Sequence, residues 1–318
     1  EYFNNQSIKK SAYYINGKLD GEFFEYYKSG SIKLKVKYRE GLKFGLMESF
    51  YSNANLKSSK SFYKGKKEGL SKAYRVDGSL EVTTFYKNSI VNGKNIIFYE
   101  DGITIKQETD YINGKRNGLD KYFRIDGTLE FIGSYKNEIL HGRSEYFYPD
   151  GLSHKSIQNY INGRRTGLFE IFRSDGTISD RFNVKNSVLN GEYEWFYPDG
   201  KTVEIRSHYI DGRENGLKEI FRENGTIQRR YNTKDGLVDG IFLWFYPDGK
   251  TVETRSHYVD GKENGLKESF RSDGTLSDRY YIVDDILQGK YEWFYPDGKT
   301  VETRSHYVDG KENGLKES

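Results

Sequence analysis

The stretch that decides the fold is GEYEWFYPDGKTVEIRSHYIDGRENG, residues 191–216. It holds an aromatic-rich run, a Pro-Asp-Gly turn signal, and a return run in which Val203, Ile205 and Tyr209 alternate with polar residues. Aromatic runs bounded by glycine, and apolar residues at every second position, are typical of β-strands. The stretch therefore predicts a β-hairpin that is closed by a tight turn at its Asp-Gly pair, with one face of the return strand in water.

The same pattern recurs along the whole chain. Anchor glycines follow one another every 24 or 25 residues, and from Gly93 onward these steps alternate, so that the full period is 49 residues. The anchors are Gly21, Gly45, Gly69, Gly93, Gly118, Gly142, Gly167, Gly191, Gly216, Gly240, Gly265, Gly289 and Gly314. Each unit has the pattern strand, tight turn, strand, looser turn. We therefore predict an all-β fold, an elongated single ribbon or solenoid of about 13 tandem antiparallel β-hairpin repeats.

The repeats define the expected domain organisation. We expect one continuous array over residues 1–318, with a partial unit at 1–13, repeats from 14 to 306 and a partial unit at 307–318. Neither end has the polar cap that terminal repeats need, and open strand edges pair readily with other chains. The sequence therefore predicts a fragment of a longer protein, whose uncapped ends could associate head to tail.

All four prolines occupy one place in the repeat. Each follows a tyrosine and precedes Asp-Gly, which is the second position of a turn. There the fixed φ of proline fits the turn and no ladder hydrogen bond is lost. The four are Pro149, Pro198, Pro247 and Pro296.

Composition excludes several classes of function. The 50 Lys and Arg against 47 Asp and Glu leave a net charge of +3, so neither nucleic acid nor membrane lipid is expected as a partner. The chain has no cysteine, which removes thiolate metal sites and thiol nucleophiles. No apolar run is long enough for a membrane-spanning helix. We find no catalytic motif, and we expect no enzyme activity and no cofactor.

Three histidines recur at the 49-residue period in the tripeptide Ser-His-Tyr: His208, His257 and His306. Four strands separate each from the next, which is roughly 19 Å at the usual strand spacing. A shared metal ion needs donors about 2 Å from it. We therefore expect solvated surface histidines and no metal site.

The candidate binding residues are an alternation of tyrosine and arginine at the sixth place after each anchor. Successive units bring Tyr beside Arg, and a tryptophan stands two residues before three of the tyrosines. Such a row is either a packing ladder of stacked rings and guanidinium groups or a binding strip, because exposed aromatics and arginine dominate recognition surfaces. The candidate strip is Tyr148, Arg173, Trp195, Tyr197, Arg222, Trp244, Tyr246, Arg271, Trp293 and Tyr295.

The repeat unit resembles a known family. YINGKLDGEFFEYYKSGSI (14–32), YINGKRNGLDKYFRIDGTL (111–129) and YVDGKENGLKESFRSDGTL (258–276) are similar to MORN-type repeats, and most similar to the bacterial variant called YwqK-like. The resemblance covers essentially the whole chain. It implies a β-hairpin ribbon used for attachment and assembly, with phospholipid contact proposed for some members and immunity roles for bacterial ones.

The leading functional hypothesis is a non-enzymatic extended module, a surface stalk, scaffold or adhesion ribbon that binds a protein or a cell-surface glycan. One alternative is a set of carbohydrate-binding repeats for cell walls or glucans, because tryptophan and tyrosine suit sugar rings. Another, implied by the resemblance, is a cytoplasmic antitoxin or immunity protein. The leading hypothesis places the chain at the cell surface or outside the cell, and the immunity hypothesis places it in the cytoplasm.

Overall fold

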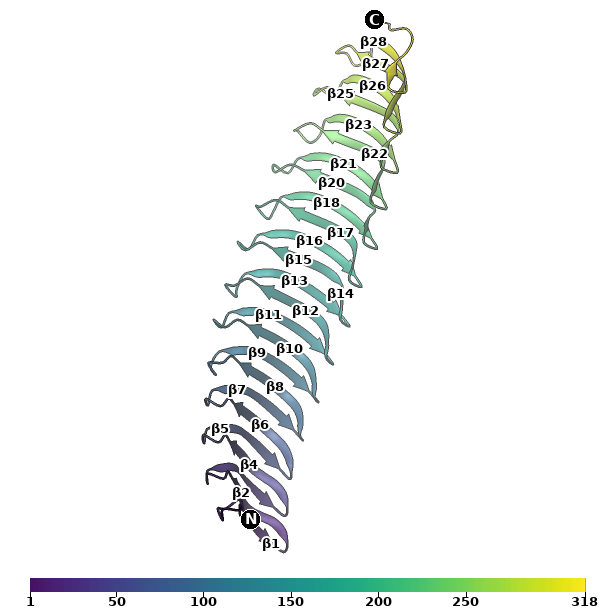
Figure 1. Cartoon of the computed structure of the whole chain (residues 1–318). Coiled ribbons are helices and arrows are strands. Elements are labelled where there is room, and N and C mark those ends of the chain that lie inside the picture. Colours follow the sequence, from purple (N-terminus) through teal and green to yellow (C-terminus); the bar gives the residue numbers. More distant parts are fainter. Residues whose placement is uncertain (318) are drawn as a thin grey trace. The chain divides into compact units, whose positions relative to one another are not determined.

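A computed structural model describes residues 1–317; Ser318, the last residue of the predicted partial unit, lies outside the described residues. These residues form 29 strands and no helix, and neighbouring strands pair antiparallel (Figure 1). The all-β prediction is therefore confirmed. The chain divides into two compact units, one of residues 1–154 and 160–163 and the other of residues 155–159 and 164–318.

The first unit is a meander in which each strand pairs with the strands before and after it in the chain. Its sheet is open: each repeat adds strands at the edge of the sheet, and each strand is six to nine residues long. The strands are Lys10–Ile15 (β1), Lys18–Tyr26 (β2), Ile32–Arg39 (β3), Leu42–Phe50 (β4), Leu56–Tyr63 (β5), Lys66–Tyr74 (β6), Leu80–Lys87 (β7), Ile90–Phe98 (β8), Ile105–Ile112 (β9), Lys115–Phe123 (β10), Leu129–Lys136 (β11) and Ile139–Phe147 (β12).

The second unit repeats this arrangement. Three of its outgoing strands are preceded by a two-residue piece that ends two residues before the anchor glycine, and a fourth such piece is the last strand of the unit. The strands are His154–Ile161 (β13, with residues in both units), Arg164–Arg165 (β14), Gly167–Phe172 (β15), Ile178–Lys185 (β16), Val188–Phe196 (β17), Val203–Ile210 (β18), Arg213–Glu214 (β19), Gly216–Phe221 (β20), Ile227–Lys234 (β21), Leu237–Phe245 (β22), Val252–Val259 (β23), Lys262–Glu263 (β24), Gly265–Phe270 (β25), Leu276–Val283 (β26), Ile286–Phe294 (β27), Val301–Val308 (β28) and Lys311–Glu312 (β29).

The two kinds of turn are the reverse of what we predicted. The tight turn is the one expected to be loose: Ile210 pairs directly with Arg213, so only Asp211 and Gly212 connect the strands. Both have positive φ, 47° and 84°, as a two-residue hairpin turn requires. The predicted tight turn at Tyr-Pro-Asp-Gly is instead a longer loop, from the end of β17 to the start of β18.

The proline prediction holds within that longer loop. The Gly200 amide donates to the Tyr197 carbonyl at 2.9 Å, which places Pro198 second in a four-residue turn. The Asp199 carboxylate accepts the hydroxyl of Thr202 and nearby backbone amides, and these bonds lower the pKa of Asp199. The loop is thus closed by its own short polar side chain.

Nine of the thirteen anchor glycines lie inside strands and do not bound them. Gly167, Gly216 and Gly265 are the first residues of β15, β20 and β25, and Gly314 lies outside the strands. Gly191 is the fourth residue of β17 and has a φ of 111°, a backbone angle that residues with a side chain rarely adopt. Beside it the register of β16 with β17 shifts between Phe182 and Val184, where one residue of β16 lies opposite three residues of β17. The anchor therefore marks a β-bulge, a local kink that glycine permits.

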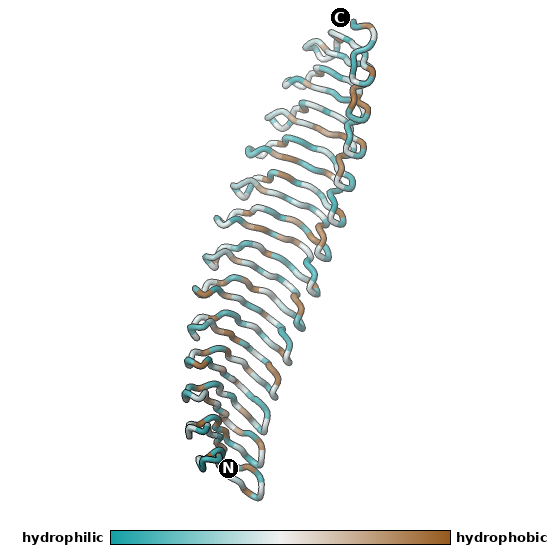
Figure 2. The backbone as a smooth tube through the Cα atoms, in the orientation of Figure 1, coloured by the Kyte–Doolittle hydropathy of each residue, from teal (hydrophilic) through white to brown (hydrophobic). Residues whose placement is uncertain are grey.

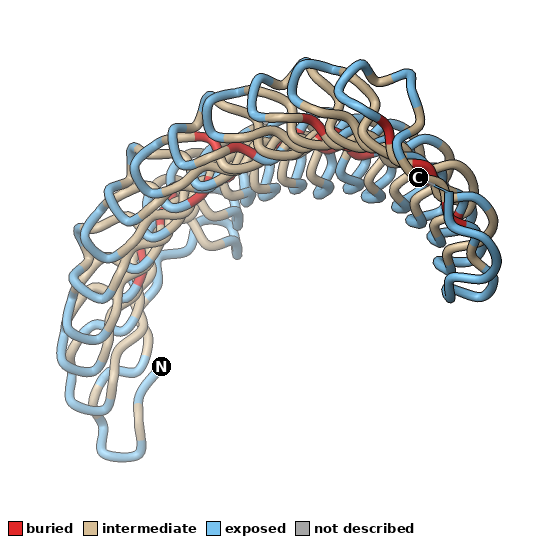
Figure 3. Tube along the Cα trace, turned by 90° about the horizontal axis from the view of Figure 1, so that it is seen from above, coloured by how far each residue is buried: buried red, intermediate tan, exposed pale blue. Residues whose placement is uncertain are grey.

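Each unit is one layer of sheet and lacks a thick core. Hydrophobic residues are scattered along strands and turns (Figure 2), and only a few residues are buried (Figure 3). Within the second unit the rings of Phe169, Phe182 and Tyr193 stack on one face at 5.2 and 5.3 Å. Such aromatic neighbours stabilise adjacent strands without a second layer.

Candidate binding surface

The sixth-place tyrosines connect each repeat to the next. The Tyr197 hydroxyl donates to the carbonyl of Phe221, 2.8 Å away, at the end of the next outgoing strand. The same bond, at 2.7 to 2.8 Å, joins Tyr27 to Phe50, Tyr51 to Tyr74, Tyr99 to Phe123, and Tyr246 to Phe270.

The arginines at the sixth place also donate a hydrogen bond to the carbonyl at the end of the next outgoing strand, and each donates a second hydrogen bond to a carbonyl of its own repeat. Arg222 donates through Nη2 to the carbonyl of Phe245 and through Nη1 to that of Ile227, both at 2.6 Å. Arg75, Arg124, Arg173 and Arg271 repeat this pair of bonds in their own repeats. We call the tyrosines and arginines at this place the Tyr/Arg row.

The Tyr/Arg row is thus a hydrogen-bonded ladder between repeats. Its polar atoms satisfy backbone carbonyls, and the strip residues Tyr148, Arg173, Arg222, Tyr246 and Arg271 are half-buried. Tyr295 is more open, at 46% exposed. Recognition by these side chains stays a prediction.

The strip tryptophans lie apart from the row. Trp195 is 47% exposed, the guanidinium of Arg229 lies 4.7 Å from the ring of Trp244, and Trp293 stacks on Tyr291 at 3.8 Å. Four strand steps separate successive tryptophans, which is roughly 19 Å. No single sugar ring can therefore touch two of them.

We expect the bonds of the Tyr/Arg row to stabilise the fold. Tyr246→Phe removes one hydrogen bond to the carbonyl of Phe270 and should cost about 1 kcal/mol of unfolding free energy. Arg222→Met removes two charge-assisted bonds and should cost about 2 to 3 kcal/mol. The midpoint of urea unfolding measures both changes. A midpoint unchanged in Arg222→Met would show that the ladder does not hold the repeats together.

A second row was not predicted from the sequence. On the face opposite the stacked rings, glutamate and arginine alternate on successive strands of the second unit. Their ion pairs span 2.7 to 3.6 Å. This Glu/Arg row is Glu170, Arg181, Glu194, Arg206, Glu219, Arg230, Arg255, Glu268, Arg279, Glu292 and Arg304.

The Glu/Arg row contains two buried acids, Glu219 and Glu292, and one gap. Burial acts to raise the pKa of Glu292, but hydrogen bonds from Arg279 and Arg304 outweigh it and hold that pKa below its usual value. Leu243 stands between Arg230 and Arg255, where the alternation calls for an acid. In the sequence, the row is visible only as a glutamate three residues after an anchor glycine. Which arginines pair with these glutamates follows only from the strand register.

The recurring histidines are exposed, as predicted: His208, His257 and His306. Within residues 1–317, no group of three or more potential metal-binding side chains is close enough to hold one ion. In the same residues no helix is long and apolar enough to cross a membrane.

A family model described as a MORN repeat variant matches residues 19–40, 189–211, 238–260 and 287–309. These four segments are MORN repeats. Three of the four matched segments each contain one of the strip tryptophans. MORN repeats are generally non-catalytic modules that bind proteins or membranes. The predicted resemblance is confirmed, while assignment to the YwqK-like branch stays a prediction.

Similarity to other proteins is remote. No curated protein matches the chain. Among solved structures, the chain resembles part of the TcdB2-TccC3-Cdc42 crystal structure (9% identity, TM-score 0.20, 98% of this chain and 22% of that one). It also resembles part of TcdB2-TccC3 (10% identity, TM-score 0.17, 99% of this chain and 20% of that one). The chain spans about a fifth of either length, and similarities this weak carry no information on function.

Proposed function

We propose that this chain is a non-enzymatic, extended protein-binding module that serves as a stalk, scaffold or adhesion ribbon. The observation that carries the proposal is the Tyr/Arg row, in which the same bond to the next repeat recurs in both units. A recurring bond fixes the distance from one repeat to the next. Equivalent surface side chains then stand at regular intervals, as multivalent binding requires.

The absence of catalysis is part of the proposal. It is supported by the non-catalytic character of MORN repeats and by a single-layer architecture in which side chains of one row mostly bond to one another. A general acid and base need a pair of groups whose environments separate their pKa values. In the Glu/Arg row the arginines hold Glu292 in its charged form, which suits an ion pair and not proton transfer.

A capture experiment tests the protein-binding proposal. The full chain is immobilised, lysate or surface extract from the source cell is passed over it, and retained proteins are identified by mass spectrometry. We expect at least one protein that soluble chain displaces and that binds reversibly in purified form. If every retained protein fails to bind once purified, the proposal is wrong. Surface placement, also a proposal, is tested by digestion of the chain on intact cells with added protease.

Carbohydrate binding is a second candidate, favoured by the exposed ring of Trp195. Because the tryptophans are too far apart to share a ring, each would bind a separate sugar on a long polymer. Changing Trp195, Trp244 and Trp293 to alanine should then abolish retention on an insoluble glucan or cell-wall column. Unchanged retention, or no retention by the unaltered chain, would remove this candidate.

A further inference from the structure

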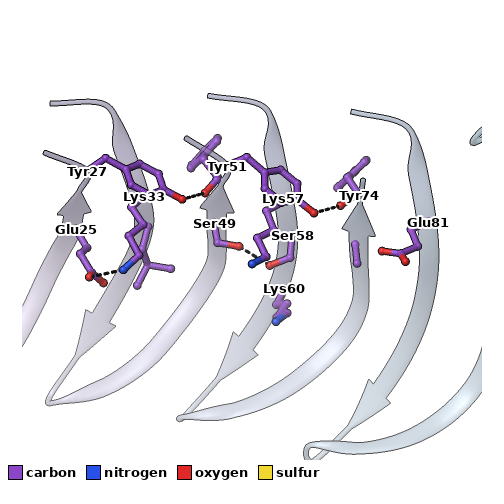
Figure 4. A pocket seen from close by; sticks show the side chains of 13 residues that line it. Glu25, Tyr27, Lys33, Ser49, Tyr51, Lys57, Ser58, Lys60, Tyr74 and Glu81 are labelled. Atoms are coloured by element: carbon purple, nitrogen blue, oxygen red, sulfur yellow. Dashed lines mark hydrogen bonds and ion pairs between the residues drawn. The ribbon is translucent and has the colours of Figure 1, made fainter. Parts of the chain in front are cut away.

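The first unit contains a hollow of about 460 Å³ on the face that carries Ser49, Ser58 and Ala73 (Figure 4). The hollow exists because these side chains are small. Ser49 and Ala73 stand at the fourth place after their anchor glycines. In the second unit three of the residues at that place are Trp195, Trp244 and Trp293.

Lys60 lines the hollow and is charged, although equivalent positions in other repeats hold uncharged residues. It pairs with Met47 on β4 and with Ser71 on β6. The equivalent residues of other return strands are uncharged: Val36, Thr84, Thr109, Gly133, Phe182, Ser207, Tyr231, Ser256, Tyr280 and Ser305.

No carboxylate neutralises Lys60. Within residues 1–317, no carboxylate oxygen lies within 4.0 Å of the ammonium of Lys60 or of Lys57, which lines the same hollow. Two glutamates line it as well. Glu25 is held by Lys33 at 2.9 Å, and Glu81 lies at the opposite end (Figure 4). The middle of the hollow is therefore positive.

The surroundings of Lys60 are short of a negative partner. Burial lowers the pKa of Lys60, and repulsion from Lys67, Lys43 and Lys57 lowers it further. Ser71, the cross-strand neighbour of Lys60, is 7% exposed, and its Oγ has no hydrogen-bond partner among the described residues. An anion bound beside Lys60 in the hollow would favour the charged form of its ammonium group.

The charge of the chain is also unevenly distributed, with the excess of positive charge in the part that contains the hollow. Residues 1–100 hold 18 Lys and Arg against 10 Asp and Glu, which is a net +8. Residues 101–318 hold 32 against 37, which is a net −5. The hollow lies in the positive part, whose field attracts anions.

We propose that this hollow binds a small organic oxyanion, a carboxylate or phosphate, between Lys57 and Lys60. Ser49 and Ser58 share one hydrogen bond at 2.7 Å, so the accepting hydroxyl keeps its own hydrogen to donate to the anion. The hydroxyls of Tyr27 and Tyr51 are held by carbonyls of the next repeat, which fixes these rings as a wall for the organic part (Figure 4). The site is separate from the proposed protein-binding function.

Phenyl phosphate and inorganic phosphate are the probes. The full chain, with ¹³C-labelled lysines, is titrated with each probe and the Lys60 signals are followed by NMR across pH. Phenyl phosphate should bind more tightly than inorganic phosphate and should raise the pKa of Lys60. If phenyl phosphate leaves the Lys60 signals unmoved, or binds no better than inorganic phosphate, the proposed site is wrong.

Three variants locate the binding. Lys60→Thr places there the residue that Thr84 already supplies in the next repeat, and Ser49→Trp fills the hollow while keeping every lysine. Both should weaken phenyl phosphate binding on the order of tenfold or more. Lys72→Thr is the matched control on the opposite face of the same sheet, where Lys72 pairs with Ser59, and it should leave binding unchanged. Binding unaffected by Lys60→Thr or Ser49→Trp would overturn the proposal.

Discussion

Replacing Gly200 with alanine should lower the free energy of unfolding by about 3 kcal/mol or more. Gly200 has a φ of +65°, and a Cβ placed there would lie 2.6 Å from the Cβ of Thr177, the last residue of the preceding loop, and 3.0 Å from the amide nitrogen of Ile178, the first residue of β16. Because one of these neighbours is backbone, the contact cannot be relieved by a side-chain rotation. Successive loops must separate, which strains the stacking of one repeat on the next.

The matched control for this change is Gly176→Ala. Gly176 also has a positive φ, +86°, but a Cβ there meets nothing within 4 Å. Gly176→Ala should lower the free energy of unfolding only by the penalty for a left-handed backbone, about 1 to 2 kcal/mol. Urea unfolding of the two variants measures the difference. Equal midpoints would show that the loops do not constrain the spacing of the repeats.

Replacing Asp120 with alanine should lower the free energy of unfolding by about 3 to 5 kcal/mol. The Asp120 side chain is fully buried in the first unit, and its carboxylate accepts from Gln107 at 2.9 Å and Thr109 at 2.7 Å. Arg116 lies 3.4 Å away as the charged partner. Removing the carboxylate leaves all three groups without their shared acceptor, and at least the buried hydroxyl of Thr109 cannot turn to water.

Asp120→Asn and Asp126→Ala are the controls for that prediction. The asparagine keeps an acceptor of the same shape and should cost less than the alanine. Asp126 also accepts two hydrogen bonds, both from Thr128, but it lies on an exposed turn. Its loss should cost on the order of 1 kcal/mol. If Asp120→Ala shifts the unfolding midpoint no more than Asp126→Ala, the buried network contributes no special stability.

The strands and their order could be predicted from the sequence because the glycine spacing and period-two alternation are local signals. The turn types were assigned the wrong way round. Both Asp211-Gly212 and Asp199-Gly200 are Asp-Gly pairs, and the dipeptide alone does not tell a two-residue turn from a longer loop. What separates them is the register, which places Ile210 directly opposite Arg213.

The side-chain rows could be predicted only in part. The alternation of tyrosine and arginine is visible in the sequence, but its target, a backbone carbonyl 23 or 24 residues later, depends on how successive loops stack. The Glu/Arg row joins residues 11 to 13 apart, so its partners follow only once bulges have set the register. The hollow beside Lys60 reflects small residues at Ser49 and Ala73, whose shared face is a property of the folded sheet.

If binding is spread over the repeats, deleting whole repeats should weaken it step by step, and a deletion series measures this. Deleting residues 246–294 removes one 49-residue period and joins Phe245 to Tyr295, which restores a Phe-Tyr step already present in the chain. Deleting 197–245 does the same with Phe196 and Tyr246, and deleting 197–294 removes two periods. Each variant should keep its β-sheet circular dichroism, because every junction preserves the repeat.

The affinity of each variant for a protein captured by the full chain is then measured by surface plasmon resonance. We expect a graded loss of affinity, with each deleted period weakening binding by a similar factor. A single deletion that abolishes binding while the variant stays folded, or a double deletion that leaves affinity unchanged, would contradict distributed binding and point to one local site.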